Sequence, residues 1–180
     1  MKRTVLTFGL ISGAMSAGMM LATLPLADSM GMKTAEIFGY TTMVLSALLI
    51  YFGIRSFRDN AGAGRLTFGQ GVAVGILIAL IASACYVGTW ELIYFKLKPG
   101  FAEKYAASMI ERAKASGASQ QKIDEKVREA QGFKQMYDKP LNNIALTFME
   151  IFPIGLLVTL ISAGILRKTG SNRRLEQAAG

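Results

Sequence analysis

A single acidic residue, Glu150, lies inside an apolar run that covers residues 141–166, and Arg167 and Lys168 follow at its end. Because a helix rises about 1.5 Å per residue, this carboxyl group lies roughly 13 Å along such a helix, near the middle of a hydrocarbon layer about 30 Å thick. An ionisable side chain at that depth is costly unless it finds a partner, water or a proton. The run therefore predicts a membrane-spanning helix with one candidate functional residue.

Three earlier stretches, residues 4–26, 37–54 and 66–90, contain no charged side chain. Each is close to the roughly 17 to 25 residues that a helix needs to cross the hydrocarbon layer. We therefore expect one all-α domain over residues 1–180, an integral membrane bundle of four transmembrane helices. The expected spans cover about residues 4–26, 35–55, 66–95 and 141–167, and Pro25 is expected to end the first of them.

The composition excludes several classes of site. The chain has no histidine and one cysteine, Cys85, which lies in the third apolar stretch, so no disulfide framework and no metal site is expected. Neither a His-Glu metal motif nor a Gly-x-Ser-x-Gly elbow is present, and we expect no catalytic residue, no cofactor and no enzyme. The net charge of +8 does not indicate nucleic-acid binding, because the basic residues cluster at span ends and on one polar segment.

Small residues recur at every fourth position in the first and third spans, where they form one face of each helix. These positions are Gly9, Gly13 and Ala17 in the first span, and Gly71, Gly75, Ala79 and Ser83 in the third. Such a face lets another helix approach closely. We expect the face of the third span to pack against the first or the fourth span.

Aromatic residues gather at the far end of the third span, where Tyr86, Trp90, Tyr94 and Phe95 follow one another closely. This grouping is typical of the membrane–water interface, where a ring is half buried and its polar atom stays hydrated. Glu91 lies among these residues. We therefore expect it to be interfacial, and we treat it as a second candidate functional residue.

Residues 96–140 differ from the rest of the chain because they are rich in charge. Pro99, Gly117 and Pro140 divide them into two segments, in each of which apolar residues recur every three or four positions. The pattern predicts an extramembrane amphipathic helical hairpin over about residues 99–138, between the third and fourth transmembrane helices. Such a hairpin can pack on itself, lie on the membrane surface, or dock onto a partner.

The positions of the basic residues predict the orientation of the chain. Four spans place both termini on one side, together with most of the basic residues near span ends: Lys2, Arg3, Arg55, Arg58, Arg65, Arg167, Lys168, Arg173 and Arg174. Such an excess favours the cytoplasm, so both termini are expected there. The ten basic residues within 96–140 oppose this assignment.

Four short motifs carry a resemblance to a known family. They are Phe-Gly-Leu-Ile-Ser-Gly (8–13), Tyr-Phe-Gly-Ile-Arg-Ser-Phe-Arg (51–58), Leu-Thr-Phe-Gly-Gln-Gly (66–71) and Lys-Pro-Gly-Phe-Ala-Glu-Lys-Tyr (98–105). Over roughly residues 4–168 the chain resembles the bacterial membrane family catalogued as domain of unknown function 4199. The resemblance implies a multi-pass protein of the bacterial inner membrane. It implies no reaction and no catalytic residue.

Two functions are consistent with these patterns. The first is a structural or accessory protein of the lipid bilayer, which assembles with a second copy or with another membrane protein through the small-residue faces and the hairpin. The alternative is a small transporter or proton-coupled conductor that uses Glu150, with Pro153 freeing a backbone carbonyl one turn away. A simpler role for Glu150 is a protonated hydrogen-bonding group that joins two helices, through Ser83, Tyr86 or Thr89.

Overall fold

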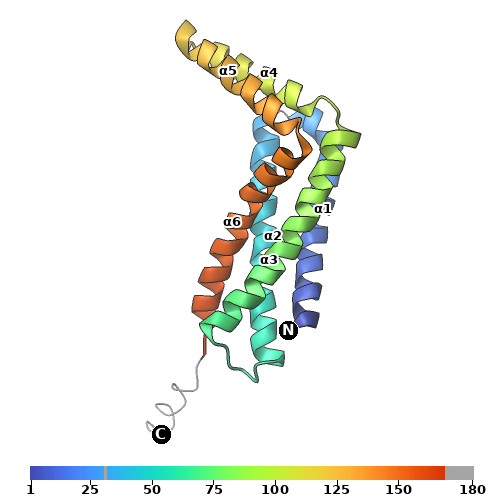
Figure 1. The fold of residues 1–180 in the computed structure, drawn as a ribbon, viewed down its shortest axis with the longest axis vertical. Helices are drawn as coiled ribbons and strands as arrows, with labels where there is room; N and C mark the ends of the chain where they lie inside the picture. Colours follow the sequence, from blue (N-terminus) through green and yellow to red (C-terminus); the bar gives the residue numbers. More distant parts are fainter. Residues whose placement is uncertain (31, 169–180) are drawn as a thin grey trace.

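The computed structural model describes residues 1–30 and 32–168, and the side chains of these except for residues 26–30, 32, 33, 35 and 36. Its helices are α1 (Lys2–Met30), α2 (Met32–Asn60), α3 (Phe68–Leu92), the π-helical segment η1 (Ile93–Leu97), α4 (Phe101–Ala115), α5 (Gln120–Tyr137) and α6 (Pro140–Leu166). Figure 1 shows α1, α2, α3 and α6 side by side in a bundle, with α4 and α5 extending from one end of it.

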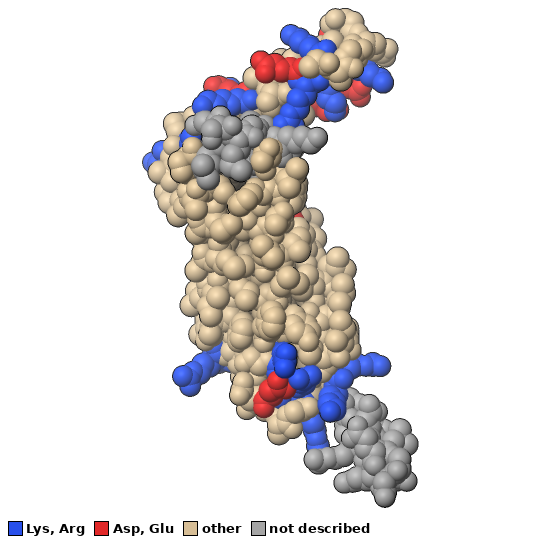
Figure 2. All heavy atoms as spheres, turned by 180° about the vertical axis from the view of Figure 1, so that it is seen from behind, with Lys and Arg blue, Asp and Glu red and all other residues tan. Residues whose placement is uncertain are grey.

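Four helical segments are long and apolar enough to cross a membrane: Lys2–Pro25, Ile37–Asn60, Phe68–Leu97 and Pro140–Leu166. The face in Figure 2 shows a broad band without charged residues between two charged ends. Because hydrocarbon cannot solvate charged side chains, such a band is what a membrane-spanning bundle requires. The expected all-α fold with four helices of this kind is confirmed.

The first helix does not end where the sequence indicated. Pro25 lies inside α1, which continues to Met30, so the prediction that it terminates the helix is wrong. A proline removes one backbone donor and crowds the preceding turn. Membrane helices tolerate this loss because neighbouring groups and small local adjustments can satisfy the freed carbonyl.

The small-residue face of α1 packs against α3. A Cβ atom added at Gly9 would lie 2.8 Å from the Cβ of Ile81, and one added at Gly13 would lie 2.6 Å from the Cβ of Cys85. Separations this short leave no room for a side chain, so the two helices approach each other through these glycines. Ala17, the third member of the face, is half-buried.

The small-residue face of α3 packs against α6. A Cβ atom at Gly75 would lie 2.5 Å from the Cγ2 of Thr159, and one at Gly155 of α6 would lie 3.0 Å from the Cβ of Ala79. Gly71, one turn before Gly75, meets α6 in the same way. Of the two neighbours expected for this face, α6 is therefore the one that covers it, and these contacts are made inside one chain.

The core of the bundle is mainly apolar toward the end that carries the N-terminus, although Thr159 and Ser162 of α6 are also buried there. Ile54, Val74 and Ile78 are fully buried there. Leu66, also fully buried, precedes α3 and exchanges two backbone hydrogen bonds with Lys168, with N···O distances of 3.1 and 2.9 Å. This pairing ties the start of α3 to the segment that follows α6.

The helices α4 and α5 form a hairpin that packs on itself. Gly117, with a φ of +68°, follows α4 in the left-handed conformation that commonly ends a helix. The rings of Tyr105 and Phe133 lie 4.9 Å apart between centroids, and Lys134 pairs with Glu103 at 2.6 Å. The hairpin is therefore an ordered helical pair whose base adjoins the bundle (Figure 1).

Candidate functional site

Asn143 joins three helices where the hairpin meets the bundle. Its side chain is fully buried; the indole Nε1 of Trp90 donates to its Oδ1 at 3.0 Å, and its Nδ2 donates to the backbone carbonyl of Tyr137 at 3.0 Å. Thr147 also donates to Oδ1, at 3.2 Å. Sequence reasoning missed this residue because an asparagine near a span end is ordinary there. The sequence feature that came nearest to indicating Asn143 was Trp90, a hydrogen-bond donor at the end of a neighbouring span.

Six aromatic residues, which we call the aromatic cluster, continue this junction. They are Trp90, Tyr94, Phe101, Tyr105, Phe133 and Tyr137. The closest pair is Phe133 and Tyr137, whose stacked rings lie 4.2 Å apart. The hydroxyl of Tyr94 donates to Asp138 at 2.9 Å. Ring packing and hydrogen bonds thus fix the base of the hairpin onto α3 and α6.

A pocket of about 380 Å³ lies at the same junction. We call it the Glu150 pocket. Its walls come from α1, α2, α3, η1, α4, α5, α6 and the segment before α4, and five of the six members of the aromatic cluster line it. Its charged lining residues are Glu150, Lys98 and Lys104. The volume lies in the range that proteins use for small molecules.

Glu150 is exposed to this pocket and is hydrogen-bonded to the side chain of Tyr40, on α2. The expected partners were Ser83, Tyr86 or Thr89. The structure places Tyr86 in the same pocket, whereas Thr89 donates to the backbone of its own helix at 2.8 Å. Sequence reasoning missed Tyr40 because a single sequence does not give the rotation of α2 relative to α6.

One hairpin tyrosine that lines this pocket, Tyr137, has a raised pKa. Burial, and after it the negative charge of Glu150, raise the pKa of Tyr137 to about 12. Tyr137 therefore contributes a neutral phenol at physiological pH. It lines the pocket together with Tyr40, Tyr86 and Tyr105, so that phenol rings from four helices line the same pocket as the carboxyl group of Glu150.

The two other candidate residues lie elsewhere. Glu91 is half-buried on α3, and among the described residues its Oε1 is a buried atom without a hydrogen-bond partner. Pro153 lies inside α6 with its side chain exposed. Neither is among the described residues that line the Glu150 pocket. The structure therefore brings Glu150 together with the aromatic residues. It does not bring Glu150 together with Glu91 and Pro153 in one site.

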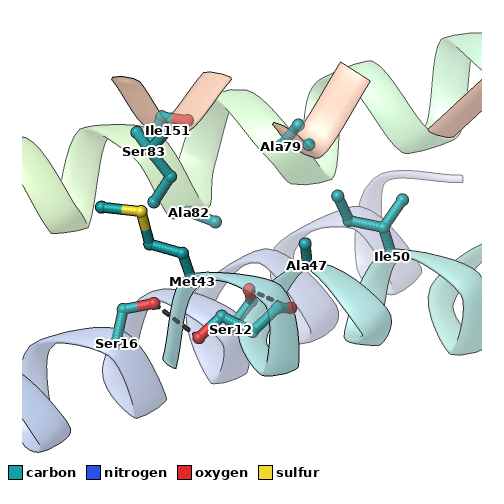
Figure 3. Close-up of a pocket in the computed structure, with 11 residues that line it drawn as sticks. Ser12, Ser16, Met43, Ala47, Ile50, Ala79, Ala82, Ser83 and Ile151 are labelled. Atoms are coloured by element: carbon teal, nitrogen blue, oxygen red, sulfur yellow. Dashed lines mark hydrogen bonds between the residues drawn. The ribbon is translucent and has the colours of Figure 1, made fainter. Parts of the chain in front are cut away.

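A second, much smaller cavity of about 20 Å³ lies within the bundle, as Figure 3 shows. Its lining includes Ser12, Ser16, Ser46 and Ser83, of which the last belongs to the predicted packing face of the third span, together with apolar residues such as Ile50. Ser12 donates to the carbonyl of Ser46 at 2.9 Å, and Ser16 donates to the hydroxyl of Ser46 at 2.6 Å. A cavity of this size has room for one water molecule. Met43 lines both this cavity and the Glu150 pocket.

The part of the chain that the structure describes contains no group of three or more His, Cys, Asp or Glu residues placed to hold a metal ion. The lining of the Glu150 pocket combines one carboxyl group, two lysines, several rings and apolar side chains. Such a lining can bind a small molecule by shape and charge.

Comparison with known proteins places the chain in a family. Neither the curated proteins nor the solved structures give a match. The family described as "Protein of unknown function (DUF4199)" matches over residues 7–168, which is most of the chain and agrees with the resemblance of the four motifs. The protein, with its bundle of four membrane-span-like helices and its attached hairpin, is therefore a member of this family.

Proposed function

We propose that this protein is a non-catalytic accessory protein of the bacterial inner membrane, which holds its hairpin at the membrane surface to bind a partner protein in the same membrane. The observation that carries the proposal is the Asn143 junction, at which buried hydrogen bonds and the aromatic cluster fix the hairpin to the bundle. A hairpin fixed in this way presents one surface, and it loses little conformational freedom when a partner binds.

The charge distribution supports a hairpin outside the bilayer and both termini in the cytoplasm. The hairpin carries exposed ion pairs, Lys126 with Glu129 and Lys134 with Glu103, which require water. Basic residues also lie at the opposite end of the bundle, which Figure 2 shows as a second charged end. Arg55 and Arg58 are near the end of α2, Arg65 precedes α3, and Arg167 and Lys168 follow α6. Of the residues on which the predicted orientation rested, Arg173 and Arg174 lie outside the described residues.

The surface available for assembly is the hairpin. The small-residue faces of α1 and α3 are covered within the chain, so they hold the bundle together and are not open to a second molecule. Apolar side chains of the hairpin, such as Ile110, Ile123 and Val127, are only half-buried between α4 and α5. This half-covered stripe fits an amphipathic helix of a partner, which would cover its remaining apolar surface.

The test is photo-crosslinking in native membranes, followed by measurement of the native mass. A photo-reactive residue at exposed positions of the hairpin, Ala107 and Gln121, should give adducts with one protein. The photo-reactive residue placed instead at position 157, where Leu157 is exposed on α6, should give only lipid adducts. A monomer in native membranes, with no protein adduct at either hairpin position, would refute the proposal.

A second candidate function, a small transporter or proton-coupled conductor, is favoured by the Glu150–Tyr40 pair and by the serine-lined cavity that shares Met43 with the Glu150 pocket. Beyond that cavity, Ile54 and Ile78 are fully buried in the core. Passage through the bundle would require this packing to open. Flux of protons or solutes into reconstituted vesicles that is unchanged by Glu150→Gln would exclude this function.

A further inference from the structure

We propose that the Glu150 pocket is a binding site for a small organic ammonium ion with an apolar body. The ammonium group would pair with Glu150, and the apolar body would lie against the aromatic and aliphatic walls. This proposal concerns binding of a small molecule and does not rest on the partner role of the hairpin.

An ionised Glu150 calls for a cation. The carboxyl group is hydrogen-bonded to Tyr40, a neutral side chain. A carboxylate with a neutral partner, in a pocket with mostly apolar walls, is poorly compensated. An ammonium ion supplies both the missing charge and a hydrogen-bond donor.

The walls favour an organic ion over a metal ion. Trp90, Tyr86 and Tyr137 line the pocket, and aromatic rings attract an ammonium group to their faces. Met20 and Met43 supply apolar surface for the rest of the ligand. Calcium takes about six to eight oxygen ligands, whereas this pocket offers one carboxyl group.

The two lysines of the pocket also bear on the charge of its ligand. Lys98 and Lys104 lie in the segment before α4 and in α4 itself, and each already has an interaction partner in the structure. Glu150 would repel an anion in this pocket, and the lysine ammonium groups would repel a cation. We assign the pocket to a cation because the lysines already have partners and the aromatic rings attract an ammonium group, and the anionic probe tests this choice directly.

The sole tryptophan of the chain, Trp90, lines this pocket and provides the readout. The whole protein in lipid nanodiscs would be titrated with cyclohexylmethylammonium while the fluorescence of Trp90 is recorded. Two probes of similar shape serve as controls, neutral cyclohexylmethanol and anionic cyclohexanecarboxylate. We expect a saturable change with the ammonium probe alone. An equal response to the alcohol would indicate simple partition into lipid, and a stronger response to the carboxylate would indicate an anion site; either result would overturn the proposal.

Two variants separate recognition from folding. Glu150→Gln keeps the shape of the side chain and removes the charge, so it should weaken binding of the ammonium probe at least about tenfold. Glu91→Gln removes the charge of a carboxyl group on α3 that does not line the pocket, so it should bind the probe with unchanged affinity. Both variants should give the gel-filtration profile of the wild type. Unchanged affinity in Glu150→Gln, or an equal loss of binding in Glu91→Gln with an intact profile, would overturn the assignment.

Discussion

Trp90 and Asn143 are joined by a hydrogen bond of 3.0 Å, from the indole Nε1 to the side-chain oxygen, at the point where the hairpin meets the bundle. This contact links two residues 53 positions apart in the chain. The same asparagine binds the last residue of α5 through its other side-chain atom. One buried amide thereby sets the position of the hairpin relative to α3.

Replacement of this amide should loosen the hairpin. Asn143→Leu leaves the Trp90 indole and the Tyr137 carbonyl without their partner, which should cost about 1–3 kcal/mol of stability. We expect faster proteolysis within α4 and α5 and a shift of Trp90 fluorescence toward the emission of hydrated indole. Asn142→Leu, at the exposed neighbouring position, is the matched control and should behave as wild type. Equal effects of the two changes would contradict the role of Asn143.

The close approach of α3 and α6 should make Gly75 intolerant of a side chain. Gly75→Ala places a Cβ atom 2.5 Å from Thr159 and should cost about 1–3 kcal/mol, measured by thermal unfolding in detergent. Gly88→Ala is the control on the same helix, because nothing lies within 4 Å of the added atom. It should be neutral or stabilise the helix by up to about 1 kcal/mol. A loss of oligomeric mass without a loss of stability in Gly75→Ala would instead indicate that this face binds a second molecule.

Tyr137 should make the protein less stable in alkali. Its pKa is about 12 in the folded state, above the ordinary value of about 10, so the folded protein holds this proton more tightly than the unfolded chain does. The corresponding stability is fully present below pH of about 10 and is lost as pH rises toward about 12. Unfolding free energies measured across this range should fall less steeply for Tyr137→Phe than for the wild type. If the unfolding free energies of the wild type and of Tyr137→Phe fall in parallel with rising pH, the raised pKa of Tyr137 is contradicted.

The proposed orientation predicts which loops an impermeant reagent can reach. Cys85 is the only cysteine, so a Cys85→Ala background allows single cysteines to be introduced. Ala115→Cys, on the hairpin, should react with a membrane-impermeant maleimide added to cells with an opened outer membrane. Ala61→Cys, between α2 and α3, should react only after the inner membrane is broken. The reverse pattern would place both termini and Ala61 outside.

Local sequence patterns predicted the long helices of this protein, but neither the π-helical segment η1 nor the end of α1. Stretches without charge located the four long helices, because a charged side chain cannot be left in hydrocarbon without compensation. Gly117 was expected to stop α4, and its positive φ is the physical reason. The prediction that Pro25 ends the first helix was wrong, because the effect of a proline depends on whether the surrounding structure can satisfy one freed carbonyl. In the structure the glycines of α1 and α3 lie close to neighbouring helices, but their spacing in the sequence did not give the partner of each face.

The amino-acid sequence by itself determined that the chain is helical, that four helices can cross a membrane, and that Glu150 lies in one of them, because these properties follow from local polarity and helix length. Only the tertiary structure decided that Glu150 meets Tyr40, that Asn143 holds the hairpin, and that the aromatic cluster encloses a pocket. These relationships depend on the rotation and the lateral order of the helices. Close packing of side chains from distant parts of the chain fixes both, and no local pattern encodes them.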